Sequence, residues 1–247
     1  MYINRKLILI IPVFNGEKIL SATFNKLDNF FCNNKYLKKI IFVDDGSSDK
    51  TAELLLNYKK TSNLNIDIIR NNKNIGKGGS IKKAVSNICN YADVIIFVDA
   101  DLPYGLISVE EIMKKMSADS TIDLIIGNRN LIKDKRQYSK YRYLFKKIFT
   151  IFLPSKVRNY TDTQSGIKGF NEKIATNFNI INTNEWCFDI ELLLIAINNN
   201  FKIVEIPVKI NELKFFGGVS LLKHGFYVLR DLYKIRNRNK KKLYKIK

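Results

Sequence analysis

Two aspartates, Asp99 and Asp101, follow an apolar run from Val94 to Val98. The run has the length and β-branched composition of a strand that is buried on both faces. Side chains at positions i and i+2 of a strand point to the same side, so the two carboxylates should emerge together where the strand ends. Two adjacent carboxylates repel each other unless a cation lies between them. Their oxygens suit Mg²⁺ or Mn²⁺, although a solvated turn that carries two aspartates fits the tripeptide equally well.

Each predicted strand in the first half of the chain ends in a polar loop. Strands are expected at 7–11, 39–43, 66–70 and 94–98, and helices between them at 19–31, 51–60 and 80–89. This alternation predicts an α/β fold, a Rossmann-like, doubly wound and mostly parallel sheet with helices on both faces. Ligands of such sheets bind beyond the carboxyl ends of the strands, so the polar loops should gather along one rim.

The second half is less regular, with helices and strands that alternate less strictly. We expect helices at 106–116, 185–198 and 221–233, a strand at 123–127, a loop and then a strand within 162–170, and an edge strand at 202–210. The composition indicates one domain over residues 1–233, followed by a basic tail at 234–247 that is expected to fray.

The chain has 247 residues and a formal net charge of +19. This charge favours an anionic partner, which could be a nucleic acid, an anionic membrane surface or a phosphorylated substrate. The three cysteines have no metal-like spacing and fit a reducing compartment, and a single histidine excludes a site with several histidines. Because no apolar run approaches the length of a spanning helix, we expect a cytoplasmic protein that is soluble or peripheral to the membrane.

Taken in order, the loops resemble glycosyltransferase family 2. The segments that carry this resemblance are IPVFNGE at 11–17, VDDGSSDKT at 43–51, NIGKGGS at 74–80, VDADL at 98–102 and GNR at 127–129. The second half resembles the dolichyl-phosphate glucosyltransferases and their polyprenyl-phosphate relatives. Its matching segments are DTQSGIKGF at 162–170, WCFDIELL at 186–193, EIPV at 205–208 and LRDLYKIR at 229–236.

This resemblance implies a GT-A fold over residues 1–233, a divalent metal, Mg²⁺ or Mn²⁺, and an inverting transfer of a hexose. The donor would be a nucleotide sugar, with UDP-glucose expected, and the acceptor a polyprenyl or dolichyl phosphate. By resemblance, Asp99 and Asp101 would hold the metal, with Ala100 between them in the donor site. The residues implied for the nucleotide are Pro12, Phe14, Glu17, Asp44 and Asp45, and those implied for the donor sugar and phosphates are Lys77, Arg129, Gln164, Lys168 and Lys214.

Several of these residues also have an ordinary structural interpretation. Asp44 and Asp45 could form a turn, Lys77 could be a solvated lysine, and Arg129 could pair with a nearby aspartate. Gln164 and Lys168 could lie on a strand surface. Glu17 is expected to replace the glutamate that the family often carries at the position of Gly16.

The acceptor decides whether the enzyme needs a general base. A phosphate is already anionic and needs none, whereas a sugar hydroxyl does, and Asp189 would be that base in the alternative function of polysaccharide or glycolipid synthesis. We expect Glu191 to be a carboxylate on a helix surface. Two further alternatives are a donor-binding pseudoenzyme and a nucleic-acid-binding protein, and the second lacks any recognisable nucleic-acid motif.

A polyprenyl-phosphate acceptor lies in a bilayer, so a route to the membrane is needed. Residues 133–153 combine cations with aromatic and aliphatic side chains and are expected to form a basic amphipathic helix. Such a helix, together with the basic tail, would bind an anionic surface at the cytoplasmic face of the membrane. A charged helix that packs on the body through its aromatic residues is the alternative.

Overall fold

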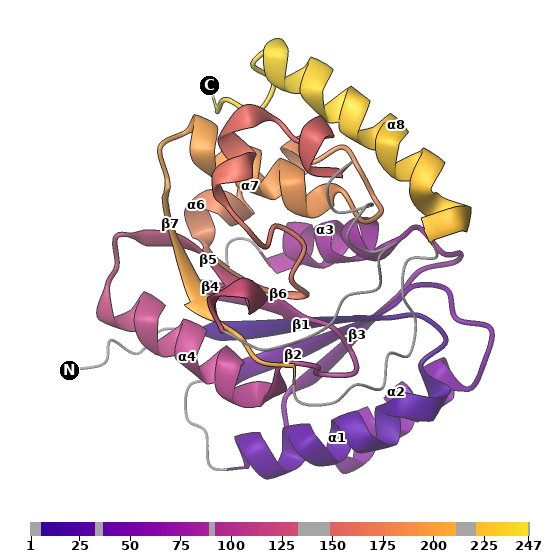
Figure 1. Ribbon diagram of the computed structural model, residues 1–247. Helices are drawn as coiled ribbons and strands as arrows, with labels where there is room; N and C mark the ends of the chain where they lie inside the picture. The colour runs from indigo at the N-terminus through magenta and orange to yellow at the C-terminus, as the bar shows by residue number, and fades with distance from the viewer. Residues whose placement is uncertain (1–5, 33–36, 89–91, 133–148, 211–220, 247) are drawn as a thin grey trace.

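In a computed structural model of the protein, the structure describes residues 6–32, 37–88, 92–132, 149–210 and 221–246 (Figure 1). Within these ranges seven strands form one sheet, in the order β3-β2-β1-β4-β6-β5-β7. Neighbouring strands are parallel except for β6, which runs antiparallel to both β4 and β5. The prediction of a doubly wound, mostly parallel sheet is confirmed.

The first four of the seven strands, β1 to β4, lie close to the positions expected for the first half of the chain. The strands are β1 (Leu7–Val13), β2 (Leu37–Asp44), β3 (Ile66–Arg70), β4 (Val94–Val98), β5 (Ile122–Asn128), β6 (Ile167–Asn171) and β7 (Lys202–Pro207). β4 is buried along its whole length because β1 and β6 flank it and helices cover both of its faces. β7 lies at the edge, as its sequence predicts.

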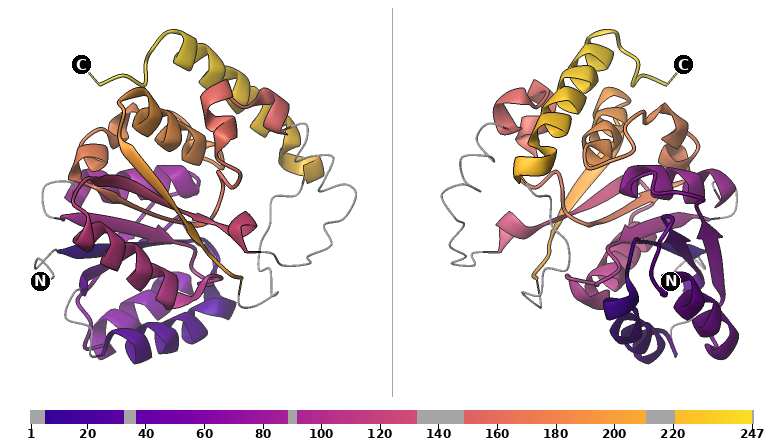
Figure 2. Two further views of the ribbon diagram at one scale, coloured as in Figure 1. Left: turned by 60° about the vertical axis from the view of Figure 1, so that its left-hand side comes forward. Right: turned by 90° about the vertical axis from the view of Figure 1, so that its right-hand side faces the viewer.

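Helices cover both faces of the sheet (Figures 1 and 2). One layer consists of α1 (Glu17–Phe31), α2 (Thr51–Thr61) and α4 (Gly105–Ala118). The other consists of α3 (Lys77–Ile88), α6 (Glu172–Ala175), α7 (Phe188–Asn198) and α8 (Leu221–Lys240). Short 3₁₀ turns are η1 (Arg129–Leu131), η2 (Ser155–Asn159) and η3 (Phe178–Ile180). No helix in the described part of the chain is both long and apolar enough to cross a bilayer.

Alternating residues of each strand enter two hydrophobic cores. Phe97 faces the α3–α7 layer, where its ring centroid lies 5.6 Å from that of Phe188. Its neighbours Ile96 and Val98 face the α1–α4 layer. The two-residue period of the strand therefore places Asp99, the next residue on the Phe97 side, beyond the end of the α3–α7 core.

The C-terminal segment differs from its prediction. α8 continues seven residues beyond the expected end at 233, to Lys240, and a turn then brings Tyr244 back into the core. The Tyr244 side chain is fully buried, and its hydroxyl donates a hydrogen bond of 2.6 Å to Glu191 Oε1. The expectation that the chain frays from residue 234 is therefore wrong, because the aromatic ring anchors this end of the chain.

Candidate active site

The loops after β1 and β2 bind each other at the carboxyl rim of the sheet. Val13 and Asp44 are sheet partners, so both strands end at the same level. Asn15 accepts a hydrogen bond from the Ser48 backbone N–H at 2.9 Å through its side-chain oxygen. Asn15 has a φ of 48°, a left-handed conformation that asparagine tolerates better than most residues. This docking leaves the ring of Phe14 half exposed beside the rim.

Asp44 and Asp45 are both buried and accept hydrogen bonds from the protein itself. Asp44 Oδ2 lies 3.2 Å from Arg70 Nε. Asp45 accepts from the backbone N–H groups of Ile75 and Gly76, each at 2.9 Å. Asp45 thus fixes the loop that enters α3, whereas the local turn foreseen as the alternative to nucleotide binding is formed by Asp44, which accepts from the Ser47 backbone N–H at 2.9 Å.

Lys77 opens α3, three residues before the helix start expected from the sequence. Its ammonium group forms an ion pair with Asp99 Oδ1, and its side chain is only 20% exposed, so the interpretation as a solvated lysine is wrong. Burial acts to lower the pKa of Lys77, but the carboxylates of Asp99 and Asp189 outweigh burial and raise it. Lys77 therefore stays charged and faces the predicted metal ligand.

Asp99 and Asp101, the predicted metal ligands, follow β4 at the end of the strand. Burial, together with the negative charge of Asp99, raises the pKa of Asp101 to about 6. Within the described ranges no three side chains of His, Cys, Asp or Glu come together as a metal cage. Asp99 already faces a cation, the ammonium of Lys77. Two such carboxylates fit a divalent ion that takes its other ligands from water and substrate oxygens.

Gly166 supports Asp99 and was not singled out by the sequence analysis. Its carbonyl oxygen accepts a hydrogen bond from the Asp99 backbone N–H at 3.2 Å. A Cβ atom on Gly166 would lie 1.7 Å from Asp99 Oδ2, so no larger residue fits while Asp99 keeps this position. The signal was the glycine in the middle of the DTQSGIKGF motif, since a close backbone approach requires this residue.

Lys168 and Asp189 form a buried ion pair beneath this group. β6 places Lys168 opposite Phe97, and Lys168 Nζ lies 2.6 Å from Asp189 Oδ1. The Lys168 and Lys77 ammonium groups lie 5.6 and 5.7 Å from the centroid of the Phe97 ring, a cation–π distance. Burial lowers the pKa of Lys168 and raises that of Asp189, while each partner opposes the shift of the other. Lys168 is fully buried, so the strand-surface interpretation is wrong.

Arg129 forms the structural ion pair foreseen as one of its two roles. Its Nε and Nη2 atoms lie 2.7 and 2.6 Å from the two carboxylate oxygens of Asp162, and its backbone N–H donates to the same group at 2.8 Å. Burial acts to raise the pKa of Asp162, but Arg129 outweighs burial and lowers it. The Nε–Nη2 edge of the guanidinium, which was predicted to meet phosphate, is thus engaged by Asp162.

Glu191 does not lie on a helix surface as expected, because its side chain is fully buried. One carboxylate oxygen accepts from the Thr183 backbone N–H at 2.6 Å, and the other accepts from Tyr244. Asn184, the residue after Thr183, accepts through its carbonyl oxygen at 2.9 Å from the Gly79 backbone N–H in the first turn of α3. The signal was the apolar sequence all around α7, since a helix of that kind is buried on every side.

The remaining predicted residues are spread around these groups. Pro12 lies within β1 and not at its end, and the exposed Glu17 accepts a 3.4 Å hydrogen bond from the Lys50 backbone N–H. The carbonyl oxygen of the buried Ala100 accepts from Thr23 at 2.6 Å, and Gln164 donates to the Trp186 carbonyl oxygen at 3.2 Å. Lys214 and residues 133–148 of the expected amphipathic helix lie outside the described residues.

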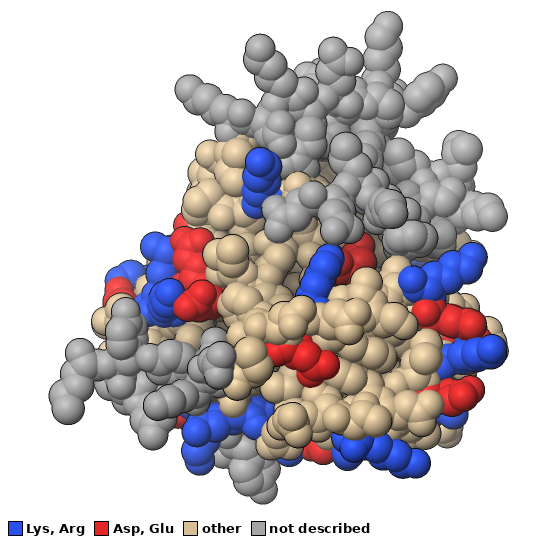
Figure 3. All heavy atoms as spheres, turned by 90° about the horizontal axis from the view of Figure 1, so that it is seen from below, with Lys and Arg blue, Asp and Glu red and all other residues tan. Residues whose placement is uncertain are grey.

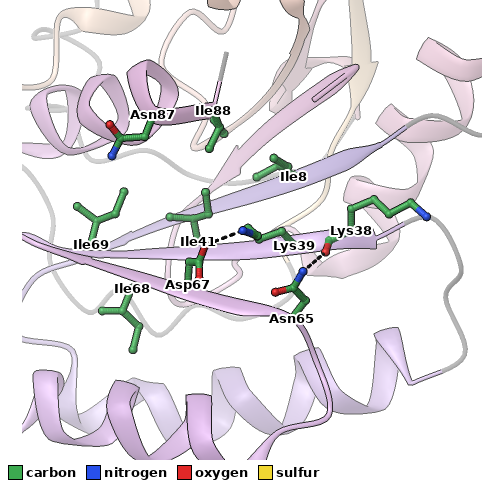
Figure 4. Close-up of a pocket in the computed structure, with 10 residues that line it drawn as sticks. All are labelled: Ile8, Lys38, Lys39, Ile41, Asn65, Asp67, Ile68, Ile69, Asn87 and Ile88. Carbon is green, nitrogen blue, oxygen red and sulfur yellow. Dashed lines mark hydrogen bonds and ion pairs between the residues drawn. The ribbon is translucent and has the colours of Figure 1, made fainter. Parts of the chain in front are cut away.

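A cavity of about 460 Å³ lies away from the rim, on the sheet beside the C-terminal end of α3 (Figure 4). It contains none of the predicted site residues. Apolar side chains such as Ile41 and Ile69 line it, and an ion pair of 2.7 Å joins Lys39 to Asp67. The candidate active site therefore rests on the charged groups around Phe97 and not on this cavity.

Sequence comparison relates the chain to known glycosyltransferases. Residues 8–180 match the model of the family described as Glycosyl transferase family 2. A dolichyl-phosphate beta-glucosyltransferase of Dictyostelium discoideum is 29% identical over 99% of this chain and 78% of its own length. Another, from Trichomonas vaginalis, is 30% identical over 93% of this chain and 76% of its own length.

Structural comparison agrees with the GT-A expectation. A crystal structure of glucosyl-3-phosphoglycerate synthase from Mycobacterium tuberculosis aligns with a TM-score of 0.65, at 14% identity, over 93% of this chain and 78% of that chain. A second structure of that enzyme, in complex with Mn²⁺ and UDP, aligns with a TM-score of 0.64 and 13% identity over 93% and 77% of the two chains. The expected GT-A fold is confirmed, and the chain belongs to glycosyl transferase family 2.

Proposed function

We propose that this protein transfers glucose from UDP-glucose to a polyprenyl or dolichyl phosphate, with inversion at the anomeric carbon. The names of the two curated relatives support the reaction class. The observation that carries the proposal is the buried ion pair of Lys168 with Asp189, next to Asp99 and Lys77. A carboxylate held in this way is not placed to take a proton from an acceptor hydroxyl, whereas a phosphate acceptor needs no such step.

Asp99 and Asp101 are the residues proposed to hold Mg²⁺ or Mn²⁺. The related structures that contain UDP with Mn²⁺ or with Mg²⁺ support this assignment. When bound, such an ion supplies positive charge that stabilises the diphosphate leaving group. The Gly166 carbonyl oxygen fixes the backbone of Asp99, while Lys77 forms the ion pair with its carboxylate.

Lys77 is proposed to bind the donor diphosphate. It occupies the first position of α3, where the positive end of the helix dipole favours an anion. The loop before it is fixed by Asp45, and the turn behind it by Asn184. A lysine held at this place contributes both charge and orientation, which is the main requirement when two anions must be brought together.

The remaining assignments follow from the same reaction. Phe14, Asp44 and Arg70 line the end of β1, β2 and β3, where the base and ribose are proposed to bind. Because the acceptor lipid is embedded in a bilayer, an anionic membrane surface is the proposed partner, and its cytoplasmic face is the proposed location. We propose that one GT-A domain carries this activity and that α8 belongs to it.

A panel of nucleotide sugars tests this function. Purified protein is incubated with UDP-glucose, UDP-galactose, GDP-mannose or UDP-N-acetylglucosamine, together with a short polyprenyl phosphate and Mg²⁺ or Mn²⁺. The expected result is one glycosylated lipid phosphate, formed from UDP-glucose with release of UDP. Transfer from another donor would overturn the choice of sugar, and the absence of transfer from any donor would overturn the function.

A further inference from the structure

Helix α8 exposes aromatic side chains on the face that points away from the core. Phe226, Tyr227 and Tyr233 are 76%, 54% and 65% exposed. On the opposite face Val228 and Leu232 are buried against the core that contains α7. Aromatic rings are the side chains that water solvates least favourably for their size, so three of them together on one outer helix face require an explanation.

The same face carries only positive charge. In residues 225–246 the sequence has eight lysines and arginines and one acidic residue, Asp231. Asp231 is turned partly inward, with 13% of its side chain exposed, and lies 3.5 Å from Arg230. The exposed cations of α8 and of the turn that follows it are Arg230, Lys234, Lys240, Lys241, Lys242 and Lys245.

The aromatic and cationic side chains share one stripe along α8. Phe226, Arg230 and Tyr233 follow the i, i+4, i+7 spacing that places residues on the same helix face. Lys234 lies seven residues after Tyr227 and flanks the stripe, and the exposed Lys241 follows the last residue of α8 in the turn beyond the helix. The guanidinium of Arg230 lies 5.4 Å from the Tyr227 ring centroid, which holds charge and ring together.

The opposite side of the molecule is different. There, the layer of α1 and α2 shows acidic and basic side chains mixed together (Figure 3). The first turns of α8 lie on the side of the sheet where β1 and β2 end, which is the side of the candidate active site (Figure 1). Exposed rings and cations thus occur together on α8, whose first turns lie on the side of that rim.

We propose that the outer face of α8 together with the turn after it, defined by Phe226, Tyr227, Arg230, Tyr233, Lys234 and Lys241, binds an anionic lipid bilayer. This proposal rests on the proposed function, because the acceptor of that reaction lies in a bilayer. Aromatic rings insert at the level of the headgroups, while lysine and arginine extend to lipid phosphates. Each cation near an anionic surface adds attraction that falls with salt.

A bilayer fits this face better than a nucleic acid does. Phosphate contacts alone explain cations, but base stacking needs a groove or platform that presents rings to single bases. The rings of α8 lie instead on the convex surface of an outer helix. An outer helix face on which exposed rings and long cationic side chains alternate matches the boundary between headgroups and acyl chains.

Cosedimentation of the full chain with vesicles tests the proposal. One set of vesicles contains phosphatidylglycerol and phosphatidylcholine, and the other phosphatidylcholine alone, with neither donor nor acceptor present. We expect binding to the anionic vesicles only, with less binding as salt rises. The Phe226→Ser/Tyr233→Ser variant should lose about tenfold or more in partition coefficient, since each ring removes substantial apolar area from water. Lys234→Glu/Lys241→Glu should lose the dependence on anionic lipid.

Matched controls come from the opposite layer. Leu56→Ser/Ile107→Ser removes two exposed apolar side chains from α2 and α4, which are 53% and 73% exposed, and should bind vesicles like the wild type. Equal binding by wild type and Phe226→Ser/Tyr233→Ser would overturn the proposal, as would no binding by the wild type or binding to an oligonucleotide but not to vesicles. Because the assay omits donor and acceptor, its result is independent of whether the proposed glucosyl transfer occurs.

Discussion

Lys168 Nζ and Asp189 Oδ1 lie 2.6 Å apart, and neither side chain is more than 6% exposed. Lys168 comes from the antiparallel strand β6, and Asp189 from the first turn of α7. Lys168 of this pair lies 5.6 Å from the centroid of the Phe97 ring, and the ammonium of Lys77 lies 5.7 Å from the same centroid. Two cations and two carboxylates thus alternate at the end of β4, and this arrangement determines what each carboxylate can do.

The Asp189→Asn variant should retain transfer to a phosphate acceptor. The amide oxygen can still accept a hydrogen bond from Lys168, and no proton has to be removed from the acceptor. A hydroxyl-acceptor enzyme would instead lose about 10²–10⁴-fold in turnover number, the usual contribution of a general base. Turnover is measured at saturating donor and acceptor, alongside the free energy of unfolding.

The control for this prediction is a variant that removes the pair and keeps its volume, Lys168→Met/Asp189→Leu. Removal of Lys168 alone should destabilise the fold by about 3–5 kcal/mol, because it leaves a buried carboxylate without its nearest cation. The double variant should be closer to wild type in stability. A large loss of turnover by Asp189→Asn at unchanged stability would contradict the assignment of Asp189 as a structural partner.

Metal binding should depend on Asp101 as well as on Asp99. Asp101→Asn removes a carboxylate whose raised pKa reflects burial and the nearby negative charge of Asp99. The affinity for Mn²⁺, measured by calorimetry without substrates and again with UDP, should fall by about tenfold or more, since even outer-shell changes have effects of that size. Glu53→Gln in the first turn of α2 is the control and should bind Mn²⁺ as the wild type does. Full activity in excess EDTA would contradict the metal assignment.

The pair of Arg129 and Asp162 should make stability depend on pH. The native pKa of Asp162 is lowered from its ordinary value of 3.8, so the unfolded chain binds this proton more readily. The stability that the carboxylate contributes is therefore fully present above about pH 4 and is lost as the pH falls below that value. Urea unfolding of wild type and Asp162→Asn should differ more at about pH 7 than at about pH 3. If the difference in the free energy of unfolding is the same at both pH values, the pair makes no pH-dependent contribution to stability.

The C-terminal turn should contribute to stability through Tyr244. Tyr244→Phe removes the hydroxyl that donates to the buried carboxylate of Glu191, and should destabilise the protein by about 1.5–3 kcal/mol, the value of a hydrogen bond to a charged group. Tyr233→Phe, on the exposed face of α8, should change the free energy of unfolding by less than about 0.5 kcal/mol. Equal effects of the two substitutions in urea unfolding would show that the turn is not anchored as described.

The sequence predicted the elements of the sheet well, because their apolar runs are continuous and polar loops bound them. It also predicted that Asp45 and Asp99 follow strands that end at one rim, since the carboxyl ends of parallel strands share an edge. It could not predict that Asp189 forms an ion pair with Lys168, or that Asp162 is the aspartate that pairs with Arg129. These pairs join segments whose relative placement depends on the antiparallel insertion of β6, and no local pattern encodes that.

The prediction of a frayed C-terminal segment was wrong for a related reason. Many lysines around Tyr244 predicted a solvated tail, although one aromatic ring and one buried acceptor are enough to hold the turn. Glu191 was expected on a surface because charged residues are seldom fully buried, but the apolar residues around it in α7 outweigh that rule. In both cases a long-range partner decided the outcome.

The central claim, transfer of glucose to a lipid phosphate without a general base, is tested most directly by one paired measurement. The same short polyprenyl chain is offered as its phosphate and as its alcohol, with UDP-glucose and Mg²⁺, and the glycosylated product is quantified. We predict product from the phosphate and none from the alcohol, with Asp189→Asn active on the phosphate. Product from the alcohol that disappears in Asp189→Asn would contradict the account and identify Asp189 as a base for hydroxyl acceptors.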